Sequence, residues 1–167
     1  MKINKELLKG SLLTALINAC MNGTINWFSV RDLVEIPLTH DLISTEADTV
    51  FSGVVSLATS LAYILTTISF LTFKIPNKPR YFPKVFFLAL RNSFFVFGVV
   101  VAIAILVQRM AGTVMMTPIE SALVSGVFAG IVGGTVDYLT KKELIDLIAS
   151  TSNLMDERKD IEEYIEE

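Results

Sequence analysis

The stretch 50–73 contains no charged residue, and this restricts the possible folds more than any other feature of the chain. The stretch 94–107 is again almost wholly aliphatic and aromatic. A helix on the surface of a soluble protein needs a charged face toward water, which neither stretch provides. Since roughly 20 apolar residues of helix cross a hydrocarbon core about 30 Å thick, the chain is predicted to be an integral membrane protein.

Four segments of the 167-residue chain have the length of a transmembrane helix, at about 7–28, 50–73, 86–107 and 119–139. The composition agrees, with 52% hydrophobic residues, 19% charged residues and a mean hydropathy of +0.58. Because every connection is short, we expect an all-α membrane domain over residues 1–140. Its four transmembrane helices should form an up-down-up-down bundle.

Helix-start signals accompany these limits. Residues 117–120 place a capping threonine, a proline and a glutamate before the fourth span. Thr45 with Asp48 predicts a similar start for the second span. Thr140 with Glu143 predicts that a further, cytoplasmic helix begins after the fourth.

Basic residues are unevenly distributed between the two predicted sides of the membrane. Only Arg31 and Arg109 fall on one side, and Arg91 lies inside the third span. Lysine and arginine are retained on the cytoplasmic side, so both termini are predicted to be cytoplasmic, in a prokaryotic plasma membrane (a cell inner membrane). The other eleven basic residues are Lys2, Lys5, Lys9, Lys74, Lys78, Arg80, Lys84, Lys141, Lys142, Arg158 and Lys159.

The first span has a second interpretation. Lysines followed by an apolar stretch that ends in Cys20 resemble a lipoprotein signal peptide. Asn18 is a poor residue so close to a cleavage point, and cleavage would leave only three spans. We therefore favour an uncleaved span in which Cys20 is a small buried hydrophobe.

The loop 31–49, on the predicted outer side, carries several carboxylates around His40. Such a loop can collect cations or hold a weak metal site. Acidic residues are also ordinary on the side that lacks lysine, and we favour a solvated loop.

Two cytoplasmic segments suggest partners. The loop 74–84 is basic and stiffened by proline, which predicts contact with anionic lipid headgroups and a role in setting the topology. The segment 141–167 has apolar residues at helical spacing and a strongly acidic end, with a predicted weak point at 150–153. It should form an amphipathic tail, repelled by anionic lipid, that either binds a cytoplasmic protein or remains solvated.

A polar stripe runs along the first span. Thr14, Asn18, Asn22 and Asn26 follow one another at four-residue steps and therefore share one face of a helix. Lipid cannot satisfy an amide, so this face must meet protein or water. Either the stripe lines a path for a polar solute or ion, or it fastens the helix to its neighbours by hydrogen bonds.

Two charges fall within the predicted spans. Arg91 and Asp137 both lie near the cytoplasmic third of the membrane. Charges at that depth often mark a transport pathway. Alternatively, Arg91 extends to the headgroup phosphates and Asp137 lies at the water boundary.

Small residues recur at every fourth position of the fourth span, at Ala122, Gly126, Gly130 and Gly134. Such a ridge lets two helix backbones approach closely. It predicts tight packing within the chain or between copies and says nothing about chemistry.

The chain carries one cysteine and one histidine, which gives no basis for a disulfide framework, a cysteine-based zinc or redox site, or a histidine-based metal site or catalytic triad. We expect no enzyme activity and no cofactor, and a net charge of −3 gives no indication of nucleic-acid binding. Two functional hypotheses remain. The chain is either a small oligomeric transporter or channel component that uses the polar stripe, or a non-transporting assembly or regulatory partner that uses the glycine ridge and the acidic tail.

Overall fold

The computed structural model of the chain describes the backbone of residues 2–39, 49–74 and 78–166, and the side chains of residues 5–39, 49–74 and 78–150. The structure is mostly helical, at 84%. The long helices are α1 (Lys2–Val30), α2 (Val50–Thr72), α3 (Phe86–Ala111) and α4 (Pro118–Glu166).

Short elements complete the connections. A π-helical turn, η1 (Tyr81–Val85), leads into α3. Strands β1 (Ile36–Pro37) and β2 (Met115–Met116) pair antiparallel and tie the two loops at one end of the helices together. The expectation of a purely helical domain missed this pair, because two-residue strands carry too short a pattern to be read from sequence.

Three helical segments of the described chain are long and apolar enough to cross a membrane: Val50–Thr72, Tyr81–Ala111 and Pro118–Ser150. The chain therefore has the character of a membrane protein. Helix α1 does not meet the same standard, although it is long and uncharged from Gly10 onward. Its three asparagines lower the mean hydropathy of the segment predicted as the first span.

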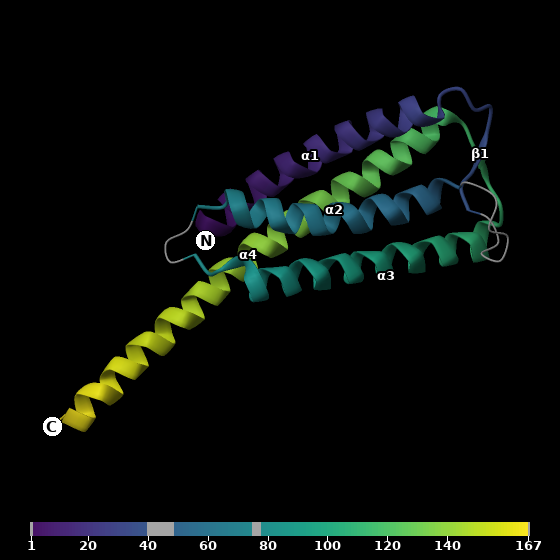
Figure 1. Cartoon of the computed structure of the whole chain (residues 1–167). Helices are drawn as coiled ribbons and strands as arrows, with labels where there is room; N and C mark the ends of the chain where they lie inside the picture. The colour runs from purple at the N-terminus through teal and green to yellow at the C-terminus, as the bar shows by residue number, and fades with distance from the viewer. Residues whose placement is uncertain (1, 40–48, 75–77, 167) are drawn as a thin grey trace.

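Successive helices run in alternate directions and pack as a row (Figure 1). Helix α1 packs along α4, α4 packs on α2, and α2 packs on α3. Helix α1 thus lies mainly against the last helix rather than against its neighbour in sequence. Helices α3 and α4 meet at few residues, which leaves a groove between them.

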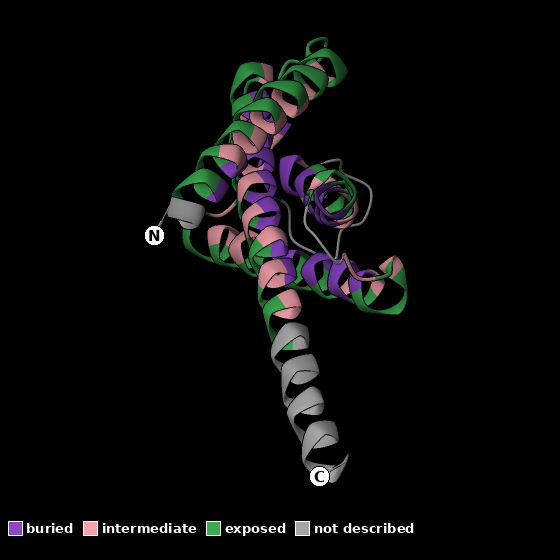
Figure 2. Ribbon diagram, turned by 90° about the vertical axis from the view of Figure 1, so that its left-hand side faces the viewer, coloured by how far each residue is buried: buried purple, intermediate pink, exposed green. Residues whose placement is uncertain are grey.

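The apolar core lies around α2, at the centre of the row. Val54, Ala58 and Ala62, at four-residue steps, are almost completely buried. Val96 of α3 and Val132 of α4 belong to the same cluster. Buried residues gather where helices meet, and the outward surfaces are exposed (Figure 2). Large apolar side chains cover much of that exposed surface, as expected where lipid is the solvent.

The start of α4 agrees with the predicted cap. The backbone N–H of Thr117 donates to Glu120, and that of Glu120 donates to the Thr117 hydroxyl. Helix α2 begins differently, with a capping box between Thr49 and Ser52. Thr45 and Asp48, predicted as its cap, lie outside the described residues.

The prediction that a separate helix begins at Thr140 is wrong. Helix α4 continues without interruption from Pro118 to Glu166, through Thr140 and through the predicted weak point at 150–153. Thr140 is fully buried and its hydroxyl faces Thr66 of α2, so tertiary packing takes the group that a cap would use. The far half of α4 extends well beyond the other three helices (Figure 1).

Candidate functional site

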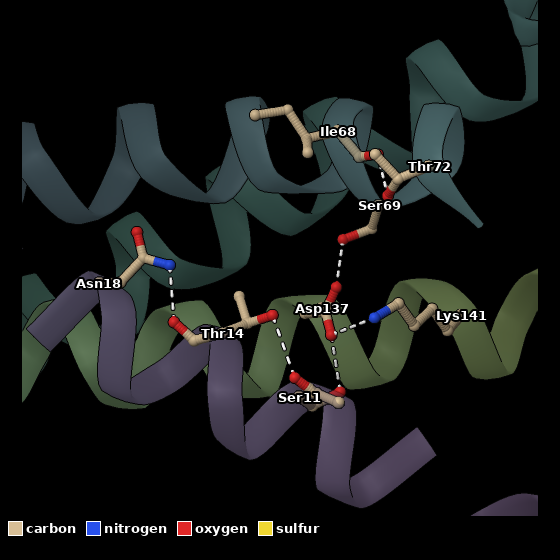
Figure 3. A network of polar contacts seen from close by, with 9 residues as sticks. Ser11, Thr14, Asn18, Ile68, Ser69, Thr72, Asp137 and Lys141 are labelled. Atoms are coloured by element: carbon tan, nitrogen blue, oxygen red, sulfur yellow. Dashed lines mark hydrogen bonds and ion pairs between the residues drawn. The ribbon is translucent and has the colours of Figure 1, made fainter. Parts of the chain in front are cut away.

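Asp137 lies at a junction of three helices (Figure 3). Its Oδ2 accepts hydrogen bonds from Ser11 Oγ of α1, at 2.7 Å, and from Lys141 Nζ of α4, at 2.6 Å. Its Oδ1 accepts one from Ser69 Oγ of α2, at 2.5 Å. The Asp137 side chain is only 5% exposed. A buried carboxylate is tolerated when hydrogen bonds and a counter-charge satisfy it, and both are present here.

The arrangement around Asp137 favours a structural role, in which the carboxylate joins three helices, over a catalytic or metal-binding role. Three donors converge on the carboxylate, and Lys141, itself 16% exposed on its side chain, balances its charge. Among the described residues no group of three or more histidine, cysteine, aspartate or glutamate side chains could hold a metal ion. The cluster joins α1, α2 and α4 at the end where α4 leaves the other helices.

A second polar network lies beside the first. Asn92 of α3 donates from Nδ2 to the hydroxyls of Thr66, at 3.1 Å, and Thr140, at 3.5 Å. The Thr66 hydroxyl donates in turn to the backbone carbonyl of Ala62, at 2.8 Å. This network joins α2, α3 and α4, so polar contacts link all four helices at one end.

Arg91 does not pair with Asp137. Its guanidinium donates to Glu143 of α4. The two side chains are 62% and 39% exposed, so this pair lies at the surface, whereas Asp137 is buried. The two charges that sequence analysis grouped together therefore belong to separate contacts.

An apolar joint accompanies these polar contacts. Leu144, one residue after Glu143, is 1% exposed and packs against Phe70 of α2 and Val85 of η1. Tyr81 packs on the same cluster, and its hydroxyl lies 3.0 Å from that of Thr67. The first turns of α4 beyond Asp137 are thus held by all the neighbouring elements.

The polar stripe of α1 is half-buried and faces α4. Asn18 donates from Nδ2 to the carbonyl of Thr14, at 2.8 Å, and Asn22 donates to that of Asn18, at 2.9 Å. Only Asn26 contacts another helix by a hydrogen bond, accepting from Ser121 of α4 at 3.1 Å. Thr14, Asn18 and Asn22 thus each donate to a backbone carbonyl of α1 itself.

The ridge of α4 faces α1 at very short range. A Cβ atom placed on Gly126 would lie 2.9 Å from the carbonyl oxygen of Ala19, and one on Gly134 would lie 2.9 Å from Cβ of Ala15. One on Gly130 would lie 3.0 Å from Cβ of Ala19. Ala122 completes the ridge, since its carbonyl oxygen lies 3.2 Å from a Cβ built on Gly23. Only glycine permits such an approach of two backbones.

The remaining sequence predictions fall at the two ends of the molecule. His40 lies outside the described residues, as does part of the basic loop, 75–77. Lys78 in that loop donates to the carbonyl of Leu71 and lies over the ring of Phe70, 4.4 Å from its centre. Cys20 is exposed on α1, so the expectation that it is buried is wrong.

Sequence reasoning missed the partners of these residues. On α1, small residues at Ser11, Ala15, Ala19 and Gly23 repeat at four-residue steps, and this signal could have identified the face that meets α4. Lys141 lies one turn after Asp137, which also suggests a pair. No local signal identifies Ser69. Comparison with known protein families, with curated proteins and with solved structures found no match.

Proposed function

We propose that the chain is a multi-pass membrane protein with four transmembrane helices and both termini in the cytoplasm of a prokaryotic cell. Its role is that of a non-transporting anchor, which mounts the far half of α4 on the membrane and presents it to a cytoplasmic protein. The observation that carries the proposal is the continuity of α4 from Pro118 to Glu166.

The contacts of α1 support a fourth span. Its backbone approaches α4 from Gly23 to Ser11, along the part of α4 that is apolar enough to cross a membrane. Leu12 and Leu16 are 65% and 61% exposed on its outer side, which is unfavourable in water and ordinary in lipid. A helix that packs so closely along a transmembrane helix should cross the bilayer with it.

Charge supports the orientation. The N-terminus, the end of α2 and the start of α3 lie at the end of the molecule where α4 leaves it (Figure 1). These regions, together with α4 beyond Asp137, hold Lys5, Lys9, Lys74, Lys84 and the other basic residues assigned to the cytoplasm. The positive-inside rule therefore favours this end as the cytoplasmic one.

The length of α4 supports a projecting helix. Its 49 residues extend for about 74 Å at about 1.5 Å per residue, whereas the hydrocarbon core is about 30 Å thick. More than half of α4 therefore lies outside the core. Its final turns carry Glu157, Asp160, Glu162 and Glu163, and anionic lipid should repel them from the membrane surface.

The contacts at the cytoplasmic end support a rigid attachment of α4 to the other helices. Ser11, Ser69 and Lys141 hold Asp137, Arg91 pairs with Glu143, and the apolar joint buries Leu144. Helix α4 is thus fixed by all its neighbours just before it leaves them. A fixed direction for α4 has no consequence if its end is only a solvated tail. It matters if this end positions a bound protein relative to the membrane.

The same contacts give the transport hypothesis no support. The amides of Asn18 and Asn22 donate to backbone carbonyls of α1, and the Asn18 side chain packs on Gly133. One N–H of each amide is therefore engaged within α1, and the Asn18 side chain is covered by α4, which favours a packing role for this part of the stripe.

Two measurements test the proposal in cells. Single cysteines at His40, Arg80 and Glu167 should react with a membrane-impermeant thiol reagent from outside, inside and inside, respectively. Reaction of residues 40 and 80 from the same side would exclude the four-span topology.

The partner is tested by photo-crosslinking along the tail. On a helix, Leu154 and Ile161 share one face, and Asp156 and Glu163 lie opposite. A photoreactive residue at either of the first two positions should crosslink to a cytoplasmic protein, and at the other two it should not. Absence of crosslinks at all four positions would overturn the anchor function and leave the topology standing.

A further inference from the structure

An apolar groove runs along the outer surface between α3 and α4, where these helices make little direct contact. It has a volume of about 110 Å³. Phe95 and Ile131 on its rims are 66% and 62% exposed, so the groove opens outward, toward the surrounding lipid. Val99 and Leu139 also line it.

The groove is elongated along the membrane normal. Its lining covers residues 92–100 of α3 and 131–139 of α4, which corresponds to about 12 Å at about 1.5 Å per residue. Along most of that length the lining is aliphatic or aromatic. This shape suits a linear hydrocarbon chain better than a compact solute.

An ion pair lies at one end of the groove. Arg91 precedes Asn92, the first lining residue of α3, and Glu143 lies one turn after Leu139, the last lining residue of α4. The ion pair between Arg91 and Glu143 therefore bridges the same two helices at the cytoplasmic end of the groove.

Positive charge exceeds negative charge at this end. Lys84 lies in η1, just before α3, and Lys142 is adjacent to Glu143 in sequence; both are exposed. The Arg91 guanidinium has five N–H donors, and its side chain is 62% exposed despite the pair with Glu143. Lys84, Arg91 and Lys142 outnumber the two carboxylates of this stretch of α4, Glu143 and Asp146, which leaves this end attractive to a phosphate.

We propose that the groove between α3 and α4 binds one anionic phospholipid. Its phosphate contacts Arg91, with Lys84 and Lys142 nearby, and one acyl chain occupies the groove. An anionic phospholipid matches both the apolar lining and the cations at the end of the groove. A soluble anion would leave the lining uncovered, and an apolar helix from a second copy would bring no negative charge to the cations. The proposal needs only that these helices lie in a membrane and is independent of any partner of the tail.

The test uses the purified full-length chain in detergent, with equal amounts of phosphatidylglycerol and phosphatidylcholine of the same acyl chains, and counts bound lipids by native mass spectrometry. The wild-type chain should retain phosphatidylglycerol in preference to phosphatidylcholine. Arg91→Gln should reduce that preference about fivefold, the factor that one cation near anionic headgroups provides. Arg91→Lys should preserve most of it, and Arg109→Gln, at the opposite end of α3, should not change it.

A second variant tests the groove without altering charge. Val99→Trp should fill the groove and prevent retention of the lipid, whereas Leu106→Trp, exposed on α3 outside the groove, should have no effect. Equal binding of both lipids by the wild-type chain would overturn the proposal, as would unchanged retention in Arg91→Gln or in Val99→Trp. Conversion of a dimer to a monomer by Val99→Trp, with lipid retention unaltered, would assign the groove to a second copy instead.

Discussion

Ser11 of α1 and Asp137 of α4 are 126 residues apart in the chain and are joined by a 2.7 Å hydrogen bond. The bond connects the first helix to the last at the point where α4 leaves the other helices. Ser69 of α2 donates to the other oxygen of the same carboxylate. Asp137 therefore acts as the common acceptor for helices that are far apart in sequence.

Ser11→Ala should lower the free energy of unfolding by about 1–3 kcal/mol, because it removes one donor from a buried carboxylate. Ser29→Ala is the matched control, since the Ser29 hydroxyl is exposed and donates to its own helix, at Ile25. Thermal or denaturant unfolding in detergent measures both variants. Equal stability of the two would mean that the contact to Asp137 contributes nothing measurable.

Gly130→Leu should destabilise the packing of α1 on α4, because even a Cβ atom at this position would lie 3.0 Å from that of Ala19. Overpacking of this kind typically costs about 1–3 kcal/mol. Gly98→Leu serves as the control, since a Cβ on Gly98 meets nothing within 4 Å. Melting of both variants in detergent checks the prediction, and it fails if Gly130→Leu melts no lower than Gly98→Leu.

Cysteines introduced singly at residues 17, 18, 21 and 22, in a Cys20→Ala chain, should all resist a water-soluble thiol reagent. Asn18 and Asn22 are half-buried against α4, whereas Ile17 and Met21 are exposed on the side assigned to lipid. Labelling rates in membranes provide the measurement. Rapid reaction at 18 and 22, with 17 and 21 protected, would favour a hydrated path and restore the transport hypothesis.

Arg91→Glu should loosen the mount of the projecting helix, because it places two acids together where a pair now bridges α3 and α4. The pair is largely exposed, so the loss of stability should be small, at most about 1 kcal/mol. The larger effect should be a broader distribution of distances between a spin label at Ile64, exposed on α2, and one at Arg158 of α4. The double variant Arg91→Glu with Glu143→Arg should restore the narrow distribution, and Arg109→Glu should leave it unchanged.

Local sequence was sufficient to predict the properties that depend only on neighbouring residues. The apolar stretches predicted at 50–73, 86–107 and 119–139 correspond to the three segments that are apolar enough to cross a membrane, because hydropathy sums over neighbouring residues. The cap at Thr117 was predicted for the same reason, since its partner Glu120 is three residues away.

Local reasoning was insufficient for α1 and for the end of α4. Asn18 and Asn22 lower the hydropathy of α1, and tertiary contacts such as the close approach of Ala19 to Gly126 are needed to relate it to a neighbouring helix. The sequence around Thr140 has the form of a cap, but burial against Thr66 keeps that residue in a continuous helix.

The sequence by itself determined the class of the protein, its most apolar helices and the stripe and ridge that need a partner. Only the tertiary structure decided which partners they meet: Ser69 is 68 residues from Asp137, and Glu143 is 52 residues from Arg91. Periodicity defines the face of a helix but not what covers it, because that choice depends on how all the helices pack at once. The order of the row, with α1 on α4 and α2 at the centre, is therefore a property of the folded chain alone.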